Sequence, residues 1–261
     1  MLNQLSAAGF APRTVRNVRA VLRDALNQAV KRRRIPYNVA TLVEIPRAEK
    51  PAITPLTPEQ ARALLKAVEG DPLEALYRVA LSLGLRRGEV LALRWEDIDF
   101  ERQELKVAGS VRRVRGVLSR RSPKPQSSIR TLPVPPLLLN ALREHRQAQD
   151  ELRKHANWQE QGLVFPSRIG TMMEPSNLHR QFKTVLQQAG LPTNIRFHDL
   201  RHSCATLLLA QGVPLVVVRD TLGHTQISTT ADIYGQVLPE THRKAVDGLD
   251  ALLGGGKVVD E

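Results

Sequence analysis

Two short helical segments, each ended by a glycine, constrain the fold of this chain more than any other feature of its sequence. The stretch from Asp199 to Leu209 carries its apolar residues on one helical face, which we expect to be buried. Gly212 is suited to end this helix, Pro214 to begin the next, and Gly223 to end that one. The apolar positions of the first helix are Leu200, Cys204 and Leu207.

Residues with acid–base and anion-binding chemistry gather around the same helices. His198, Arg201 and the small Ala205 fall on the face opposite the apolar one, which leaves room for a group to approach the imidazole and the guanidinium. His224 follows directly after the second helix, and Tyr234 falls on a short third helix that begins at a run of serine and threonine. Two bases, a fixed cation and a phenol can therefore converge on a single anion.

The order H-x-x-R, then L-G-H, then tyrosine resembles the C-terminal signature of the tyrosine recombinases, the phage-integrase family of site-specific DNA recombinases. Two earlier segments extend the resemblance. The family's G-x-R-x-x-E motif matches residues 84–89, which include Arg86 and Glu89. Lys124, ahead of Arg130, resembles the lysine that the family carries in a β-hairpin turn. The resemblance runs from about residue 11 to residue 239, and the motifs are specific because all of them occur in the family's order.

The resemblance implies a mostly α fold with a small antiparallel β-sheet, an α+β catalytic domain, and a small helical N-terminal piece. It also implies a DNA recombinase or integrase that cleaves and rejoins DNA through a 3′-phosphotyrosyl intermediate, with no metal, ATP or other cofactor. The residues that match the family's catalytic set are Arg86, Lys124, His198, Arg201, His224 and Tyr234. Glu89 would orient Arg86, and His202 would contact the catalytic residues without touching the DNA.

The same resemblance implies that the partner is double-stranded DNA. Exchange of strands between two duplexes needs four active sites, so a homotetramer assembled on DNA is expected, with an accessory DNA-bending protein as a further possible partner. Two runs of arginine are candidate contacts to phosphate. One lies on a long amphipathic helix predicted over residues 13–33, and the other in the stretch Ser110–Arg130, which has no acidic residue. The candidates are Arg16, Arg19, Arg23, Arg112, Arg113, Arg121 and Arg130.

The charge of the chain agrees with such a partner. Its 261 residues carry 38 Lys and Arg against 26 Asp and Glu, a formal charge of +12, which favours binding to a polyanion. An anionic membrane surface is the rival, but we find no apolar run of transmembrane length and no signal sequence. We expect a protein of the bacterial cytoplasm, host- or phage-encoded, that works at the nucleoid. Cys204 is the one cysteine, and its apolar face predicts a packed thiol in a reducing compartment.

Proline and apolar periodicity divide the chain into four expected parts. Residues 1–45 would be part of the helical domain that clamps DNA, shorter than the four or more helices usual in the family. Residues 46–57 form a proline-rich linker, and Thr57-Pro58-Glu59-Gln60 then opens a helix with a capping box. Residues 58–238 would be the catalytic domain, and residues 239–261 an amphipathic helix and tail that would dock on their own domain or on a neighbouring subunit.

The catalytic part has further predicted elements. Helices are expected at about 58–68, 72–83, 136–153 and 177–188, and strands within 98–134, most clearly at 105–107 and 129–132. His145, His155, His179 and His242 fall on polar or mixed helical faces and are expected at the surface.

Three alternatives remain open on sequence alone. The stretch from His198 to His202 is close to the zincin motif H-E-x-x-H, although aspartate replaces glutamate and no third ligand is evident. A catalytically silent or truncated DNA-binding relative is a second reading, which the short N-terminal region supports. An integrase of a conjugative transposon is a third, because the sequence does not separate it from one of a phage.

Overall fold

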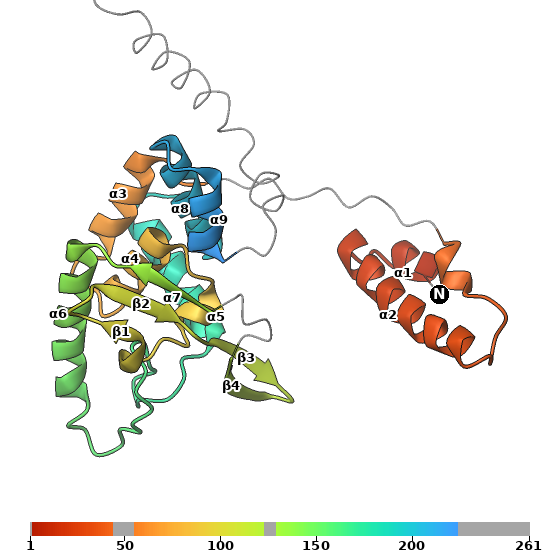
Figure 1. The fold of residues 1–261 in the computed structure, drawn as a ribbon, viewed down its shortest axis with the longest axis horizontal. Coiled ribbons are helices and arrows are strands. Elements are labelled where there is room, and N and C mark those ends of the chain that lie inside the picture. Colours follow the sequence, from red (N-terminus) through yellow and green to blue (C-terminus); the bar gives the residue numbers. More distant parts are fainter. Residues whose placement is uncertain (1, 44–54, 123–128, 224–261) are drawn as a thin grey trace, which may run out of the picture. The chain divides into compact units, whose positions relative to one another are not determined.

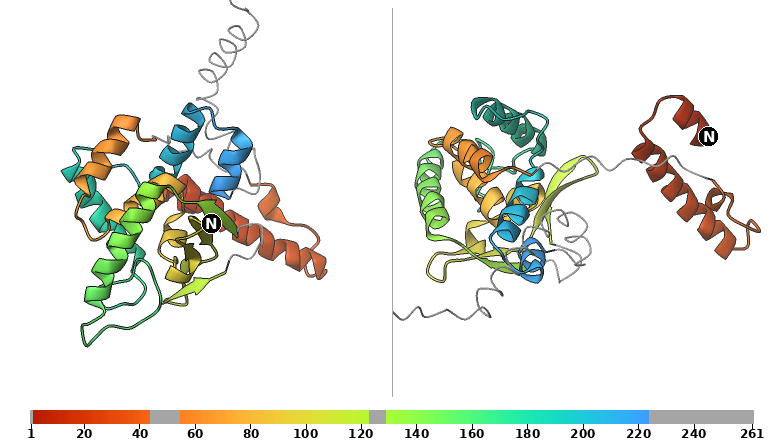
Figure 2. Two further views of the ribbon diagram at one scale, coloured as in Figure 1. Left: turned by 60° about the vertical axis from the view of Figure 1, so that its left-hand side comes forward. Right: turned by 90° about the horizontal axis from the view of Figure 1, so that it is seen from above.

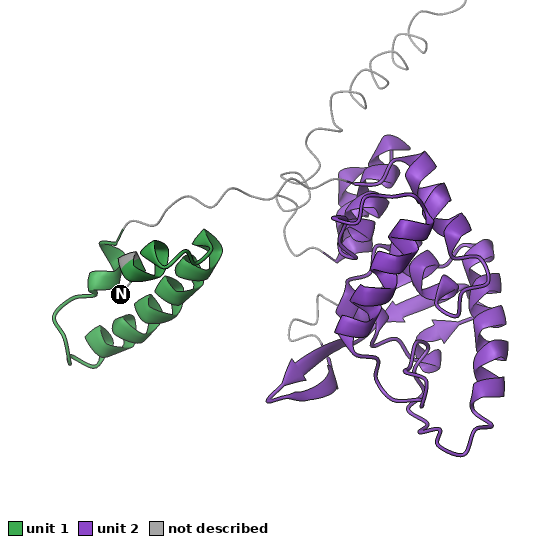
Figure 3. Cartoon of the chain, turned by 180° about the vertical axis from the view of Figure 1, so that it is seen from behind, with its two compact units in different colours: residues 1–52 green, residues 53–261 purple. Residues whose placement is uncertain are grey.

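The computed structural model describes residues 2–43, 55–122 and 129–223, and its chain divides into two compact units, residues 1–52 and 53–261 (Figures 1 and 3). Lys124, His224, Tyr234 and the C-terminal segment 239–261 lie outside the described residues, as does most of the expected linker. Each unit is described by itself. No helix among the described residues is both long and apolar enough to cross a membrane.

The first unit is a helical hairpin closed by one short turn. Its elements are α1 (Leu2–Ala7), α2 (Pro12–Lys31) and the 3₁₀ helix η1 (Val39–Thr41). Asn38 caps η1 by accepting from the backbone N–H of Ala40, and its amide donates to the carbonyl of Arg23 in α2 at 2.8 Å. The long helix predicted over residues 13–33 is confirmed by α2, and Val15 is the buried residue of its apolar stripe.

The second unit holds the remaining helices and all the described strands. The helices are α3 (Pro58–Ala67), α4 (Glu74–Leu83), α5 (Arg87–Val90), η2 (Trp95–Asp97), α6 (Pro136–Leu152), α7 (Pro175–Gln188), α8 (Asp199–Ala210) and α9 (Leu215–Leu222). The strands are β1 (Ile98–Asp99), β2 (Glu104–Val107), β3 (Ser110–Val114), β4 (Val117–Arg121) and β5 (Arg130–Pro133). The expected fold class, mostly α with small antiparallel sheets, is confirmed.

The second unit begins where the sequence places a helix start. The Thr57 hydroxyl accepts from the backbone N–H of Gln60 at 3.2 Å, and the Gln60 side chain accepts from the N–H of Thr57 at 3.0 Å. This is the predicted capping box. Leu56 already belongs to the core, two residues before the expected start of the catalytic domain, with 2% of its surface exposed.

Helix α4 forms the centre of this unit because it is apolar on nearly every side. It contacts α3, α5, α6 and α8, and a stacked Tyr77–Phe182 pair joins it to α7 with ring centroids 6.0 Å apart. Phe197 packs edge-to-face on Phe182 at 5.6 Å. The chain is thus anchored in the core directly before His198. Figure 2 shows the two blue helices α8 and α9 lying against each other beside this core.

The three-stranded sheet has the order β1-β2-β5 and is antiparallel throughout. In this sheet Leu105 pairs with Leu132, and both side chains face the core, whereas Lys106 and Thr131 face outward. Arg130 lies two residues before Leu132 and so shares the inward face. Strands β3 and β4 form a separate two-stranded hairpin.

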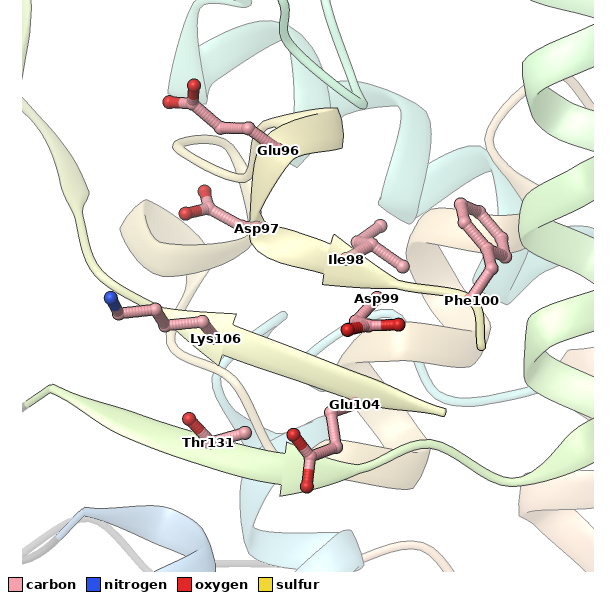
Figure 4. A pocket seen from close by; sticks show the side chains of 8 residues that line it. All are labelled: Glu96, Asp97, Ile98, Asp99, Phe100, Glu104, Lys106 and Thr131. Atoms are coloured by element: carbon pink, nitrogen blue, oxygen red, sulfur yellow. The ribbon is translucent and has the colours of Figure 1, made fainter. Parts of the chain in front are cut away.

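The outward face of the sheet carries a shallow pocket of about 410 Å³ (Figure 4). Four carboxylates and a single lysine contribute to its lining, so it favours cations over phosphate. It lies on the face of the sheet opposite to that of Arg130. The lining residues are Glu96, Asp97, Ile98, Asp99, Phe100, Glu104, Lys106 and Thr131.

Two local expectations are wrong. His145 is not a surface residue: its Nε2 lies 2.7 Å from the carbonyl oxygen of Val164, and its ring packs 5.1 Å from that of Phe165. Burial lowers the pKa of this imidazole. Ala205 leaves no room for an approaching group, because it is fully buried among Leu209, Val218 and Leu222, where α9 covers it.

Candidate active site

Arg86 stands at the start of α5, where two backbone turns fix its place. Helix α4 ends at Gly84, whose φ of 62° is left-handed, and α5 begins directly after Arg86. The carboxylate of Glu89 then binds both the backbone and the side chain of this arginine. The Oε2 of Glu89 accepts from the backbone N–H of Arg86 at 3.0 Å, and its Oε1 accepts from the Arg86 Nη1 at 2.8 Å. The Arg86 side chain stays 40% exposed, so its guanidinium can still reach a ligand.

Glu89 also binds a second arginine. Arg130 donates from its Nη2 to the Oε2 of Glu89 at 3.0 Å, and both side chains are less than 10% exposed. Burial raises the pKa of this carboxyl, but the charge and hydrogen bond of Arg130, together with those of Arg86, lower it more, so the net pKa lies below its usual value. Glu89 is therefore ionised over the whole neutral range.

Arg201 is buried, with 2% of its surface exposed, and it joins two helix ends. Its Nη1 donates to the carbonyl oxygen of Gly84 at 2.7 Å, and its Nη2 donates to that of Leu222 at 2.6 Å. A side chain at Gly84 would clash there, since a Cβ would lie 2.6 Å from the Cδ2 of Leu222. Packing against Leu222 of the L-G-H motif therefore requires a glycine at position 84.

The C-terminal end of α9 accepts hydrogen bonds from the arginines of both motifs. The carbonyl of Thr221 accepts from the Arg130 Nε at 2.8 Å, that of Leu222 from Arg201, and that of Gly223 from the Arg86 Nη2 at 3.3 Å. The last carbonyls of a helix lack partners within the helix and carry partial negative charge. Arg130 of β5, Arg201 of α8 and Arg86, which directly precedes α5, therefore hold the turn that leads to residue 224.

His198 lies at the start of α8, within the field of the same cations. His198 is exposed, but partial desolvation of its imidazole and the charges of Arg201 and Arg86 lower its pKa, although Asp199 opposes this. The ring of His202 meets that of His198 edge-to-face, with centroids 4.9 Å apart. Burial and the neighbouring His198 lower the pKa of His202 to about 4. At neutral pH both rings are therefore uncharged bases.

Two polar side chains fasten the beginning of α8. Asp199 accepts from Arg196 at 2.7 Å through the side chain and at 2.8 Å through the backbone N–H. The Ser203 hydroxyl donates to the carbonyl of Asp199 at 2.7 Å and accepts from the N–H of Leu56 at 2.8 Å. The start of the second unit, at Leu56, is thus bound to the helix that carries Arg201.

The structure brings together Arg86, His198 and Arg201 with the supporting residues Glu89 and His202. It gives other partners to three of the expected DNA contacts. Arg130 is bound inside the molecule, and Arg19 donates to the carbonyls of Ala40 and Thr41, within the first unit. Arg113 pairs with Glu174 across the surface. The remaining candidates are exposed: Arg16, Arg23, Arg112 and Arg121.

The described residues around the zincin-like motif do not form a set of zinc ligands. Asp199 occupies the position of the zincin glutamate, but its carboxylate is bound to Arg196. Within residues 2–43, 55–122 and 129–223, no group of three His, Cys, Asp or Glu side chains lies close enough to hold a metal ion. The thiol of Cys204 is buried, and burial raises its pKa to about 12, as its place on the apolar face predicts.

Comparisons with known proteins agree with the arrangement of these motifs. The model of the phage integrase family matches residues 55–241. The tyrosine recombinase XerC-like protein of Caldanaerobacter subterraneus subsp. tengcongensis is 35% identical over 96% of this chain and 69% of its own length. The ICEBs1 integrase of Bacillus subtilis is 30% identical over 95% of this chain and 68% of its own length.

A solved structure of the Tn1549 transposon integrase in complex with a circular intermediate DNA has the same fold, with a TM-score of 0.78. It is 21% identical, and the match covers 95% of this chain and 83% of that one. The motifs, which meet around α8 and α9, and the similarity to these relatives lead to the same conclusion. The chain belongs to the phage integrase family and is a site-specific tyrosine recombinase.

Proposed function

We propose that the chain cleaves and rejoins double-stranded DNA at a single phosphodiester, with Tyr234 as the nucleophile. The observation that carries this proposal is that Arg86 and Arg201 meet at the C-terminal end of α9, directly before residue 224, and that the charges of both act on His198. A phosphate bound here would meet the exposed guanidinium of Arg86, with the buried positive charge of Arg201 behind it. Together these two charges would stabilise the added charge of a pentacoordinate phosphorus.

In the proposed reaction the Tyr234 oxygen attacks phosphorus, and a new O–P bond replaces the bond from phosphorus to the 5′ oxygen. The proton of the phenol passes to His198, which is neutral and able to accept it because its pKa is lowered. Lys124 donates a proton to the departing 5′ oxygen, and His224 donates a hydrogen bond to a nonbridging oxygen. The 3′-phosphotyrosyl ester keeps the energy of the broken bond, so a 5′ hydroxyl can reverse the step without ATP.

DNA would contact the exposed arginines of both units. The β3–β4 hairpin presents Arg112 and Arg121, and α2 presents Arg16 and Arg23. Such contacts release counterions, so binding should weaken steeply with salt. The Tn1549 integrase is itself in complex with DNA in its structure, which supports the same partner here. This partner would place the protein at the bacterial nucleoid.

The assembly is part of the same proposal. A homotetramer on DNA would supply four active sites for exchange between two duplexes, and an accessory protein could bend the DNA between them. Residues 1–45 would clamp the duplex, residues 58–238 would carry the chemistry, and residues 239–261 would dock on their own or a neighbouring subunit.

Covalent trapping tests the chemistry directly. Binding sites are first enriched from a random-sequence duplex pool, and a labelled site with a nick beside the cleavage position is then incubated with the protein. We expect a covalent protein–DNA adduct with the wild type and none with Tyr234→Phe. An adduct of normal yield with Tyr234→Phe would reject this tyrosine. Retained DNA binding with no adduct from the wild type would instead indicate a catalytically silent relative.

The same assay tests the proposed lack of a metal. Adduct formation should be equal with and without EDTA, because Arg86 and Arg201 supply the charge that metal ions supply in other nucleases. Loss of the adduct on chelation, restored by Mg²⁺, would contradict this part of the proposal.

A further inference from the structure

We propose that Arg130 is a positioning residue of the recombination reaction, which holds Arg86 and the last turn of α9 in place without touching DNA. This inference rests on the proposed function, because it concerns how the same site is held. It replaces the expectation that Arg130, as part of a basic stretch, contacts phosphate.

Arg130 points into the molecule because of its register in β5. It shares the inward face of the strand with Leu132, while Thr131 between them is exposed. Its side chain is 8% exposed, and its Nε and Nη2 are both used, on Thr221 and Glu89. The Nη1 is buried and has no hydrogen-bond partner among the described residues. A side chain placed in this way has no free edge at the surface for a DNA phosphate.

The contact with Glu89 fixes the orientation of Arg86. The Glu89 Oε2 accepts from Arg130 at 3.0 Å and from the backbone N–H of Arg86 at 3.0 Å, while its Oε1 remains for the Arg86 Nη1. Without Arg130 the carboxylate would keep only Arg86 as a charged partner, and it could turn about its own side-chain bonds. The guanidinium of Arg86, which is 40% exposed, would then lose its fixed direction.

The contact with α9 fixes the turn that precedes residue 224. Arg130 donates to the Thr221 carbonyl at 2.8 Å, and Gly223 packs on the same guanidinium. A Cβ at Gly223 would lie 2.8 Å from the Arg130 Nη1, so only glycine fits this approach, and its φ of 64° also favours glycine. Arg130 thus joins α5, β5 and α9 at one point, between the first arginine motif and the L-G-H motif.

Arginine is required here by geometry rather than by charge alone. A lysine carries one nitrogen at the end of a flexible stem, whereas the contacts to Thr221 and Glu89 use two nitrogens of a rigid plane. Arg130→Lys therefore keeps the charge but cannot make both contacts. A displacement of about 1 Å at a catalytic group can slow a reaction about 10²-fold, so the effect should appear in the rate of the chemical step.

The experiment compares Arg130→Lys with Arg112→Gln, an exposed arginine of the hairpin. Two quantities are measured: the single-turnover rate of adduct formation at saturating DNA, and the slope of log affinity against log salt. For Arg130→Lys we expect a rate about 10- to 100-fold slower, with affinity and salt slope unchanged. For Arg112→Gln we expect a salt slope smaller by about one and a rate close to that of the wild type once DNA is saturating.

Two results would overturn the inference. One is an Arg130→Lys rate within about twofold of the wild type, and the other is a fall of about one in its salt slope, which would mark a phosphate contact. If the lysine variant does not melt cooperatively, Arg130→Gln serves in its place under the same criteria. Failure of the wild type to form any adduct would count against the proposed function instead, so the two failures are distinct.

Discussion

The carbonyl oxygen of Gly84 accepts a hydrogen bond of 2.7 Å from the Nη1 of Arg201, which joins two motifs 117 residues apart in the chain. The same guanidinium reaches the Leu222 carbonyl, so the ends of α4 and α9 meet on one buried cation. Helix ends have unpaired carbonyls that would be costly to bury alone. Arg201 donates hydrogen bonds to two of these carbonyls, and the same bonds fix the position of its guanidinium.

Gly223→Ala should destabilise the second unit more than a matched substitution elsewhere. The left-handed φ alone costs roughly 1–2 kcal/mol for alanine, and here the new Cβ would also lie 2.8 Å from Arg130. We expect a loss of about 2–4 kcal/mol in the free energy of unfolding, measured by urea denaturation. Gly190→Ala is the control, because its φ is 66° but nothing lies within 4 Å of its Cβ. Equal losses for both variants would show that contact with Arg130 contributes nothing.

Ser203→Ala should release the start of the second unit from α8. The variant leaves the buried N–H of Leu56 without its acceptor, which typically costs about 1–3 kcal/mol. Thr206→Ala on the same helix is the control, since its buried hydroxyl has no hydrogen-bond partner among the described residues. We expect that change to be neutral or stabilising in the same urea titration. A control variant as unstable as Ser203→Ala would mean that the serine hydroxyl is not the cause.

Much of the fold could be predicted because local signals and packing agree. The capping box at Thr57, the left-handed glycines after α4 and α9, and the packed thiol of Cys204 each follow from one backbone or side-chain preference. The pairing of Arg86 with Glu89 follows from their spacing on one helical turn. Such features depend on a few neighbouring residues, so the sequence alone is enough to predict them.

Features that depend on distant partners could not be predicted in this way. His145 looks like a surface residue from its own helix, and only the Val164 carbonyl, which comes from another segment, explains its burial. The basic neighbours of Arg130 favour a phosphate contact, whereas its register in β5 favours the interior. The alternation Arg130-Thr131-Leu132 does place it inward, but which carboxylate it meets there is decided by the packing of α5 against β3 and of α9 against β5.

Cys204 should be inert towards thiol reagents in the folded protein. It is buried, and its pKa of about 12 leaves almost no thiolate at neutral pH. Because it is the one cysteine in the chain, the absorbance released by a disulfide reagent reports on this site alone. We expect modification only at the rate of unfolding, and fast, stoichiometric modification in urea. Rapid reaction in buffer would contradict the packing of α8 against α4.

Acid should destabilise the second unit through His202. The pKa of its imidazole is about 4 in the folded protein, against about 6.5 in an unfolded chain, because burial and the neighbouring His198, Arg196 and Arg201 oppose its protonation more than Asp199 favours it. The unfolded state therefore binds more protons between these values. The stabilising contribution is complete above pH 6.5, falls as the pH drops towards 4, and changes no further below that.

The size of this effect follows from the shift, and a variant isolates it. The shift corresponds to roughly 3 kcal/mol at most, and less if the ring gains water on protonation. Urea titrations of the wild type at pH 7.5, 6, 5 and about 4 should show stability falling with acid, as linkage requires. In His202→Gln the fall should be smaller by up to that amount, whereas His155→Gln, on the surface, should follow the wild type. If His202→Gln lost stability over this range as steeply as the wild type, protonation of His202 would not be coupled to unfolding. The lowered pKa of His202 would then not be a property of the folded protein, and it could not be used to explain why the neighbouring His198 is uncharged.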